Sequence, residues 1–203
     1  MTRLSIDTPH GPASVELHCS PEARAALLLG HGAGGGIAAP DLVAATRAAQ
    51  QAGVDVALVE QPYRVAGRRA PAPASQLDAA WLAVAAELGR RSFDGLPLVF
   101  GGRSSGARVA CRTAAAGSAV AVLCLAFPVH PPGRPDRDRM PELDAVDVPV
   151  LVVQGENDPF GRPPPWHRRE LVLLPGDHSL KADLGCLGRA VREWLERILR
   201  PLD

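Results

Sequence analysis

The chain has 203 residues, of which 46% are hydrophobic and 22% are charged. This is the size and composition of one globular domain whose core needs neither a metal nor a disulfide to fold. Its 22 basic and 22 acidic side chains cancel, so the chain lacks the positive charge typical of nucleic-acid binders and membrane-surface proteins, and we expect neither kind of partner.

The N-terminal segment carries no predicted secretion signal. Ser5, Asp7 and His10 interrupt any apolar stretch behind Arg3. The longest apolar run, residues 119–129, is too short to cross a bilayer. We therefore expect a cytoplasmic protein.

Four cysteines are scattered along the chain without a C-x-x-C spacing. This pattern predicts neither a zinc site nor a redox pair, and free thiols are the expected state. We expect no metal and no cofactor.

Short apolar runs alternate with helical stretches along the chain. The apolar runs predict strands over residues 15–19, 25–29, 54–59, 96–100, 120–127, 148–153 and 171–174. Apolar residues at helical spacing predict helices over residues 41–52, 76–90, 107–116 and 184–199. Because most of the strands are apolar throughout, we expect a mostly parallel sheet that is covered by helices on both faces. The predicted fold class is α/β, with a single domain over residues 1–203.

A G-x-S-x-G motif occupies residues 102–106, between a predicted strand and a predicted helix. A nucleophilic serine needs such a tight turn, and the glycines on either side let the strand and the helix approach closely. Centring the motif on Ser105 would require glycine at Arg103 and Ala107, so Ser104 is the candidate nucleophile. The alternative is a glycine-rich turn with an incidental serine.

A serine hydroxyl is a poor nucleophile and needs a base. For this motif the expected chain order is serine, then an acid, then histidine. His178 follows the last predicted strand and precedes the last helix, which is the expected position of the base. His130 follows an earlier strand and His167 lies in a loop rich in proline and arginine, where a packed or solvated histidine is more common.

The acid should come shortly after the strand predicted over residues 148–153. Glu156 and Asp158 are both available there. Asp158 is the better candidate because Pro159 fixes the backbone directly after it. The alternative for Asp158 is a turn that merely ends the strand.

Acyl transfer also needs hydrogen-bond donors for the developing oxyanion. The backbone N–H of Ser105 is one candidate, because it opens the helix after the nucleophile. The second is the N–H of Ala33, in the glycine-rich segment 31–36 that follows an early strand. The alternative for this segment is a phosphate-binding loop, but it lacks the Lys-Ser/Thr of a P-loop and does not fit the G-x-G-x-x-G spacing.

Side chains near these segments are candidate substrate contacts. They are His31, Tyr63, Arg64, Arg103, His130 and Phe160. Nine arginines also fall in three segments that each follow a predicted strand, residues 61–75, 128–141 and 161–169. If all three lie at the carboxyl edge of the sheet, they predict a preference for anionic acyl substrates. The alternative is that these loops are simply solvated.

With these residues in place, the chain resembles the α/β-hydrolase superfamily over nearly its whole length. Within it, the chain more closely resembles a small, cap-less, dienelactone-hydrolase-like group that includes the hydrolase-like domain of the eukaryotic NSL acetyltransferase complex. The matching segments are residues 31–34, 101–106, 128–133, 153–161 and 176–178.

The resemblance implies an α/β-hydrolase fold without a large cap domain and a Ser104–Asp158–His178 triad. The sequence departs from the group at two positions. Dienelactone hydrolases proper carry cysteine where Ser104 stands, so their specific reaction is not implied. Relatives often carry a larger residue where Ser105 stands, so the wall of the site differs.

Two classes of function are consistent with these features. The first is a serine hydrolase that cleaves a small ester or thioester through an acyl-enzyme intermediate. The second is a non-catalytic binding or scaffold module built on a hydrolase fold. The predicted triad favours the first, with a small-molecule ester or acyl substrate as the partner, and the sequence leaves the oligomeric state open.

Overall fold

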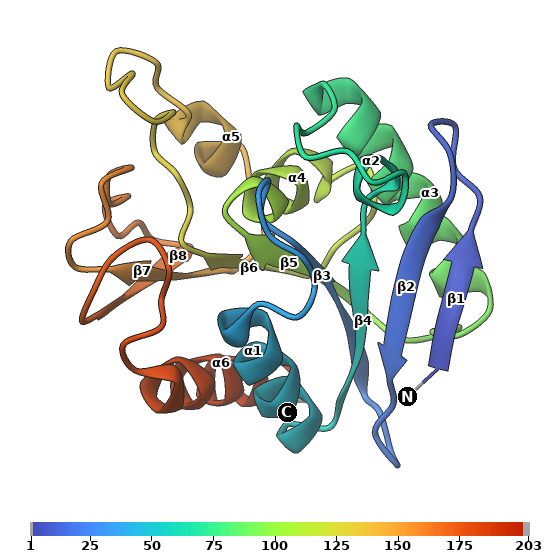
Figure 1. The fold of residues 1–203 in the computed structure, drawn as a ribbon. Helices are drawn as coiled ribbons and strands as arrows, with labels where there is room; N and C mark the ends of the chain where they lie inside the picture. The colour runs from blue at the N-terminus through green and yellow to red at the C-terminus, as the bar shows by residue number, and fades with distance from the viewer. Residues whose placement is uncertain (1, 201–203) are drawn as a thin grey trace.

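An eight-stranded sheet runs through the middle of the computed structural model, which describes residues 2–200 (Figure 1). The strands are β1 (Thr2–Ile6), β2 (Ala13–His18), β3 (Ala25–Gly30), β4 (Val54–Glu60), β5 (Leu98–Arg103), β6 (Ala121–Leu125), β7 (Val150–Gly155) and β8 (Arg169–Leu174). They lie in the order β1-β2-β4-β3-β5-β6-β7-β8. Strand β2 is antiparallel to β1 and β4, and every other neighbouring pair is parallel. The mostly parallel sheet predicted from the sequence is confirmed.

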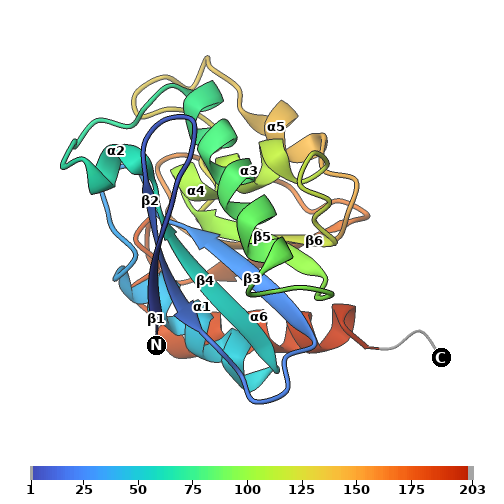
Figure 2. The ribbon, with the colours of Figure 1, turned by 90° about the vertical axis from the view of Figure 1, so that its right-hand side faces the viewer.

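Helices cover both faces of this sheet (Figures 1 and 2). On one face lie α1 (Pro40–Gln51) and α6 (Leu184–Ile198), which pack against each other. On the other lie α3 (Ala74–Arg90), α4 (Ser105–Thr113) and the short α5 (Met140–Asp144). A single turn, α2 (Pro62–Val65), follows β4. Among residues 2–200, no helix has both the length and the apolar character that crossing a membrane requires.

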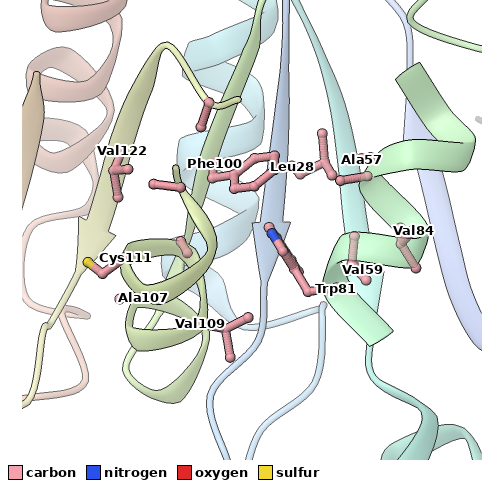
Figure 3. Packing of buried hydrophobic residues seen from close by; sticks show 14 of the residues in the cluster. Leu28, Ala57, Val59, Trp81, Val84, Phe100, Ala107, Val109, Cys111 and Val122 are labelled. Carbon is pink, nitrogen blue, oxygen red and sulfur yellow. The ribbon is translucent and has the colours of Figure 1, made fainter. Parts of the chain in front are cut away.

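A separate hydrophobic core fills each side of the sheet. In the central strand β3, Leu27 joins the core under α1 and α6, while Leu28 joins the core under α3 and α4. Trp81 of α3 and Phe100 of β5 are fully buried in the second core and meet edge to face, with ring centroids 5.5 Å apart (Figure 3). Burial on both faces explains why the strands read as continuous apolar runs.

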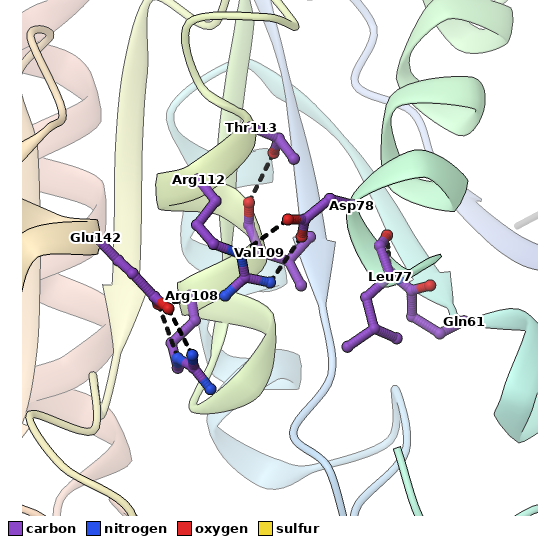
Figure 4. Close-up of polar contacts among 8 residues, drawn as sticks. All are labelled: Gln61, Leu77, Asp78, Arg108, Val109, Arg112, Thr113 and Glu142. Atoms are coloured by element: carbon purple, nitrogen blue, oxygen red, sulfur yellow. Dashed lines mark hydrogen bonds and ion pairs between the residues drawn. The ribbon is translucent and has the colours of Figure 1, made fainter. Parts of the chain in front are cut away.

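Ion pairs fix helix α4 on both of its flanks (Figure 4). The guanidinium of Arg112 donates bonds of 2.8 and 2.6 Å to Asp78 of α3. The guanidinium of Arg108 donates bonds of 2.8 and 2.5 Å to Glu142 of α5. Bidentate ion pairs of this kind restrain the orientation of the two side chains as well as the distance between them. The helix that begins directly after Ser104 is therefore held in place by its neighbours.

Three elements were not predicted from the sequence. Strand β1 is a five-residue edge strand, and only Leu4 and Ile6 in it are buried or half-buried apolar residues. Helices α2 and α5 have four and five residues, too few to show a helical period. Of the single domain expected over residues 1–203, residue 1 and residues 201–203 lie outside the described residues.

Candidate active site

Ser104 lies at the sharp turn between β5 and α4, with φ 52° and ψ −108°. The two motif glycines are required by close backbone contacts. A Cβ on Gly102 would lie 2.6 Å from the carbonyl carbon of Gly106, and a Cβ on Gly106 would lie 2.4 Å from the oxygen of Gly30. The strand–turn–helix arrangement predicted for residues 102–106 is therefore present, with Ser104 at its apex.

Three side chains from distant parts of the chain form a hydrogen-bonded series. Nε2 of His178 lies 2.9 Å from Oγ of Ser104, and Nδ1 of His178 lies 2.7 Å from Oδ2 of Asp158. The carboxylate accepts from the Nδ1–H, which leaves Nε2 free to accept from the serine hydroxyl. The Asp158 side chain is fully buried, while that of His178 is 15% exposed. The series therefore opens to solvent at its serine end.

The connections that carry Asp158 and His178 are in direct backbone contact. The N–H of Asn157 donates a 2.9 Å bond to the oxygen of Gly176, and the N–H of Glu156 donates a 2.8 Å bond to that of Leu174. A Cβ on Gly155 would lie 2.3 Å from the oxygen of Asp177. Only glycine at position 155 allows the two connections to come this close.

The structure adds a buried residue that the sequence analysis missed. Nε2 of Gln154 lies 2.8 Å from Oδ2 of Asp158, and it also lies 3.1 Å from the oxygen of Phe127 and 2.9 Å from that of Gly161. The backbone N–H of Phe160 donates a 2.8 Å bond to the other carboxylate oxygen, Oδ1. The only local signal was a glutamine directly after the apolar run that ends at residue 153.

Phe160, one of the candidate substrate contacts, lies beside His178, and His130, another of them, contacts the backbone of Phe160. The ring of Phe160 meets the imidazole of His178 edge to face, with centroids 4.4 Å apart. His130 is half-buried, its backbone N–H donates a 3.3 Å bond to the oxygen of Phe160, and its Nδ1 lies 3.0 Å from the oxygen of Pro131. Phe160 therefore forms one wall beside the imidazole.

The glycine-rich segment 31–36 lies against the Ser104 turn. A Cβ on Gly32 would lie 3.7 Å from the Cβ of Ser104. The buried Tyr63 donates a 3.1 Å hydrogen bond from its hydroxyl to the oxygen of Ala33. Within residues 2–200, neither the Ala33 N–H nor the Ser105 N–H has a hydrogen-bond acceptor. Both groups are therefore available to an oxyanion.

His31 supports this segment from behind. It is only 3% exposed, and its Nδ1–H donates a 2.8 Å bond to the oxygen of Gly32. Its Nε2 accepts a 3.1 Å bond from the N–H of Gln61. Burial lowers the pKa of His31 below its ordinary value of 6.5, in keeping with a neutral ring. Because both ring nitrogens are engaged by the backbone, His31 is not available to a substrate.

The two candidate arginines differ in their surroundings. Arg103 has its Nε 2.8 Å from Oδ2 of Asp41 and its Nη2 3.1 Å from the oxygen of His178. Arg64 is half-buried, and its Nη1 lies 3.5 Å from the oxygen of Arg68. The guanidinium of Arg103 is thus occupied by internal contacts, and Asp41 is a second residue that the sequence analysis missed.

Nine arginines were expected at the carboxyl edge of the sheet, and this expectation is wrong for two of them. Strands β7 and β8 are parallel, so the connection between them returns to the opposite end of the sheet. Arg168 lies there, with its oxygen accepting from the N–H of Val150 at the start of β7. Arg169 is buried at the start of β8 and pairs with Asp144. Neither arginine lies at the carboxyl edge near Ser104.

Cys19, Cys111, Cys124 and Cys186 are free. Within the described part of the chain, no group of three His, Cys, Asp or Glu side chains is arranged to hold a metal ion.

A nucleophile turn, an imidazole and a buried carboxylate at the carboxyl edge of this sheet are the defining features of α/β hydrolases. A family model described as an alpha/beta hydrolase domain matches residues 23–190, and the chain belongs to this family. No curated protein matches the sequence.

Solved structures share this fold over nearly their whole length. A lidless α/β serine hydrolase from Xanthomonas campestris has a TM-score of 0.78 and 23% identity, covering 100% of this chain and 96% of that chain. Est1E from Butyrivibrio proteoclasticus has a TM-score of 0.78 and 17% identity, covering 98% and 99%. A dienelactone hydrolase from Anabaena variabilis has a TM-score of 0.76 and 20% identity, covering 98% of each chain. The similarity to a dienelactone hydrolase is confirmed at the level of the fold, while the relation to the NSL-complex domain stays a prediction.

Proposed function

We propose that this chain is a serine hydrolase that cleaves a small ester or thioester. The observation that supports the proposal most directly is the hydrogen-bonded series from Oγ of Ser104 through His178 to Asp158, with distances of 2.9 and 2.7 Å. Serine is activated in this way by an adjacent base that a third group orients. The series lies at the carboxyl edge of an α/β-hydrolase sheet, where its serine end is open to solvent.

In the proposed mechanism, Oγ of Ser104 attacks the acyl carbonyl while Nε2 of His178 takes its proton. The N–H groups of Ser105 and Ala33 stabilise the negative oxygen of the tetrahedral intermediate. His178 then gives its proton to the leaving group, and Asp158 stabilises the imidazolium that forms in between. Water releases the acyl group in the second half of the reaction, with His178 acting again as the base.

The residues at the site and the structural neighbours support this substrate class. Serine at position 104 is suited to carboxylic esters and thioesters. One neighbour is a dienelactone hydrolase, and another solved structure has ferulic acid bound to Est1E. We infer an ester or thioester whose acyl group reaches Ser104 from an open surface.

The alternative is a binding module that has kept the fold without the reaction. A fluorophosphonate probe separates the two, because it reacts covalently only with an activated serine. We expect the wild-type protein to be labelled and to hydrolyse short-chain esters. We expect Ser104→Ala to lose labelling and to lower turnover roughly 10³-fold or more.

Two outcomes would contradict the proposal. A wild-type protein that is neither labelled nor active on any ester would favour the binding module. Loss of labelling in Ser105→Ala with retention in Ser104→Ala would mean that the nucleophile is wrongly assigned.

A further inference from the structure

One guanidinium group connects the segments that meet at the proposed site. Arg103 lies between Gly102 and Ser104 at the end of β5. Its Nε lies 2.8 Å from Oδ2 of Asp41 in α1, and its Nη2 donates a 3.1 Å bond to the backbone oxygen of His178. The third nitrogen, Nη1, lies 2.8 Å from where a Cβ on Gly32 would stand.

The partner of this guanidinium is buried. The Asp41 side chain is 1% exposed, whereas that of Arg103 is 20% exposed. Oδ1 of Asp41 also accepts a 3.0 Å bond from the N–H of Leu42, which fixes the carboxylate at the start of α1. Burial raises the pKa of Asp41, and the positive charge of Arg103 opposes this effect. A buried carboxylate without Arg103 would therefore destabilise the fold.

The contact with His178 has a consequence for the reaction. Ser104 is the residue next to Arg103 in the chain, so the position of Arg103 follows that of the nucleophile. The hydrogen bond to the backbone oxygen of His178 then fixes the base relative to the same point. One side chain thus restrains both partners of the 2.9 Å contact between Oγ of Ser104 and Nε2 of His178.

We propose that Arg103, anchored by Asp41, is a positioning residue that holds the backbone of His178 at the distance from Ser104 that proton transfer requires. This inference rests on the proposed hydrolase function. A displacement of about 1 Å at a reacting group can lower the rate about 10²-fold. A lysine could not replace Arg103, because one ammonium group lacks the fork that reaches Asp41 and His178 together.

The test must separate positioning from simple structural support. Arg103→Met removes the donor to His178 and also leaves the buried Asp41 unpaired. The double variant Asp41→Asn/Arg103→Met removes that buried charge as well, so its melting temperature should recover relative to Arg103→Met. The donor to His178 is absent from both variants. Arg169→Met serves as the matched control, because Arg169 is buried, pairs with the carboxylate of Asp144 and lies at the opposite end of the sheet from Ser104.

The readouts are the rate and the endpoint of fluorophosphonate labelling, together with kcat and KM for a short-chain ester. We expect Arg103→Met and the double variant to be labelled to the same endpoint as the wild type, but about 10²-fold more slowly. We expect kcat to fall in parallel with the labelling rate and KM to change little. The control should label at the wild-type rate.

A double variant that recovers both its melting temperature and the wild-type labelling rate would overturn the inference, because Arg103 would then act only through stability. An unchanged rate in Arg103→Met would also overturn it, while leaving the hydrolase function intact. A wild-type protein that is not labelled at all would overturn the proposed function and this inference with it. Because this outcome concerns the wild type, it is distinct from a failure of the inference about Arg103, which only the variants can show.

Discussion

Gln154 and His178 bind the same oxygen of Asp158. Nε2 of Gln154 lies 2.8 Å from Oδ2 of Asp158, and Nδ1 of His178 lies 2.7 Å from that atom on another side. Gln154 is fully buried at the end of β7. Gln154, a residue of the sheet, therefore orients the carboxylate of Asp158 independently of His178.

This relationship predicts that Gln154→Met lowers turnover without touching the three proposed catalytic residues. The variant removes a hydrogen bond to a carboxylate, a loss of about 2 kcal/mol in the free energy of unfolding, and we expect kcat to fall about tenfold as Asp158 gains freedom. Chemical denaturation and steady-state kinetics would measure both effects. Gln61→Met is the matched control, because Gln61 is also buried and donates from its side chain to the oxygen of Leu77. It should lose stability and keep kcat, and an equal loss of kcat in both variants would contradict the prediction.

The choice of Asp158 over Glu156 can be tested by two amide substitutions. Asp158→Asn should lower kcat by up to about 10⁴-fold, because the amide stabilises the wrong tautomer of the imidazole. Glu156 is exposed, so Glu156→Gln should change kcat little. Measuring kcat for each variant, normalised to the folded fraction, checks the assignment. A severe effect of Glu156→Gln with a mild effect of Asp158→Asn would show that the acid is the other carboxylate.

The buried His31 predicts a specific dependence of stability on pH. Burial lowers the pKa of His31 from 6.5, so the unfolded chain binds a proton on this residue more readily than the native protein does. The contribution of His31 to the free energy of unfolding is therefore fully present above pH 6.5. It is lost as the pH falls below that value towards the pKa of His31 in the native protein. Urea denaturation of wild type and His31→Gln between about pH 8 and pH 5 measures the difference. The difference in the free energy of unfolding between the two proteins should become smaller at acidic pH. A difference that stays constant with pH would mean that His31 does not change its protonation on unfolding.

Local patterns predicted much of this site because its chemistry depends on local backbone. A turn between a strand and a helix needs small residues at fixed offsets, so residues 102–106 indicated Ser104. The positions of Asp158 and His178 could be predicted because each follows a strand, and parallel strands end at the same edge of the sheet.

The remaining features depend on contacts between distant segments, which spacing does not reveal. Arg103 and Asp41 are far apart in the chain, and nothing in the sequence near either residue indicates the other. The same limit explains why the position of Arg168 was wrongly predicted. Arg168 follows a strand, but the connection from β7 to β8 returns to the opposite end of the sheet and carries it there. Gln154 resembled a strand residue, and only its contact with Asp158 distinguishes it.

The backbone at Ser104 has a consequence for stability. With φ at 52°, Ser104 adopts a conformation that favours glycine and costs another residue about 1–3 kcal/mol. Ser104→Gly and Ser104→Ala both lack the hydroxyl, so comparing them removes the effect of the hydroxyl on stability. We expect the free energy of unfolding of the glycine variant to be about 1 kcal/mol higher than that of the alanine variant. The gain is this small because the greater freedom of glycine in the unfolded chain offsets part of the relief of backbone strain.

A chain that only bound a partner would gain stability from glycine at this position. This chain instead holds a strained serine with its hydroxyl 2.9 Å from an imidazole nitrogen. The protein is less stable than it could be at the residue proposed as the nucleophile, which is the cost expected where activity needs a strained conformation.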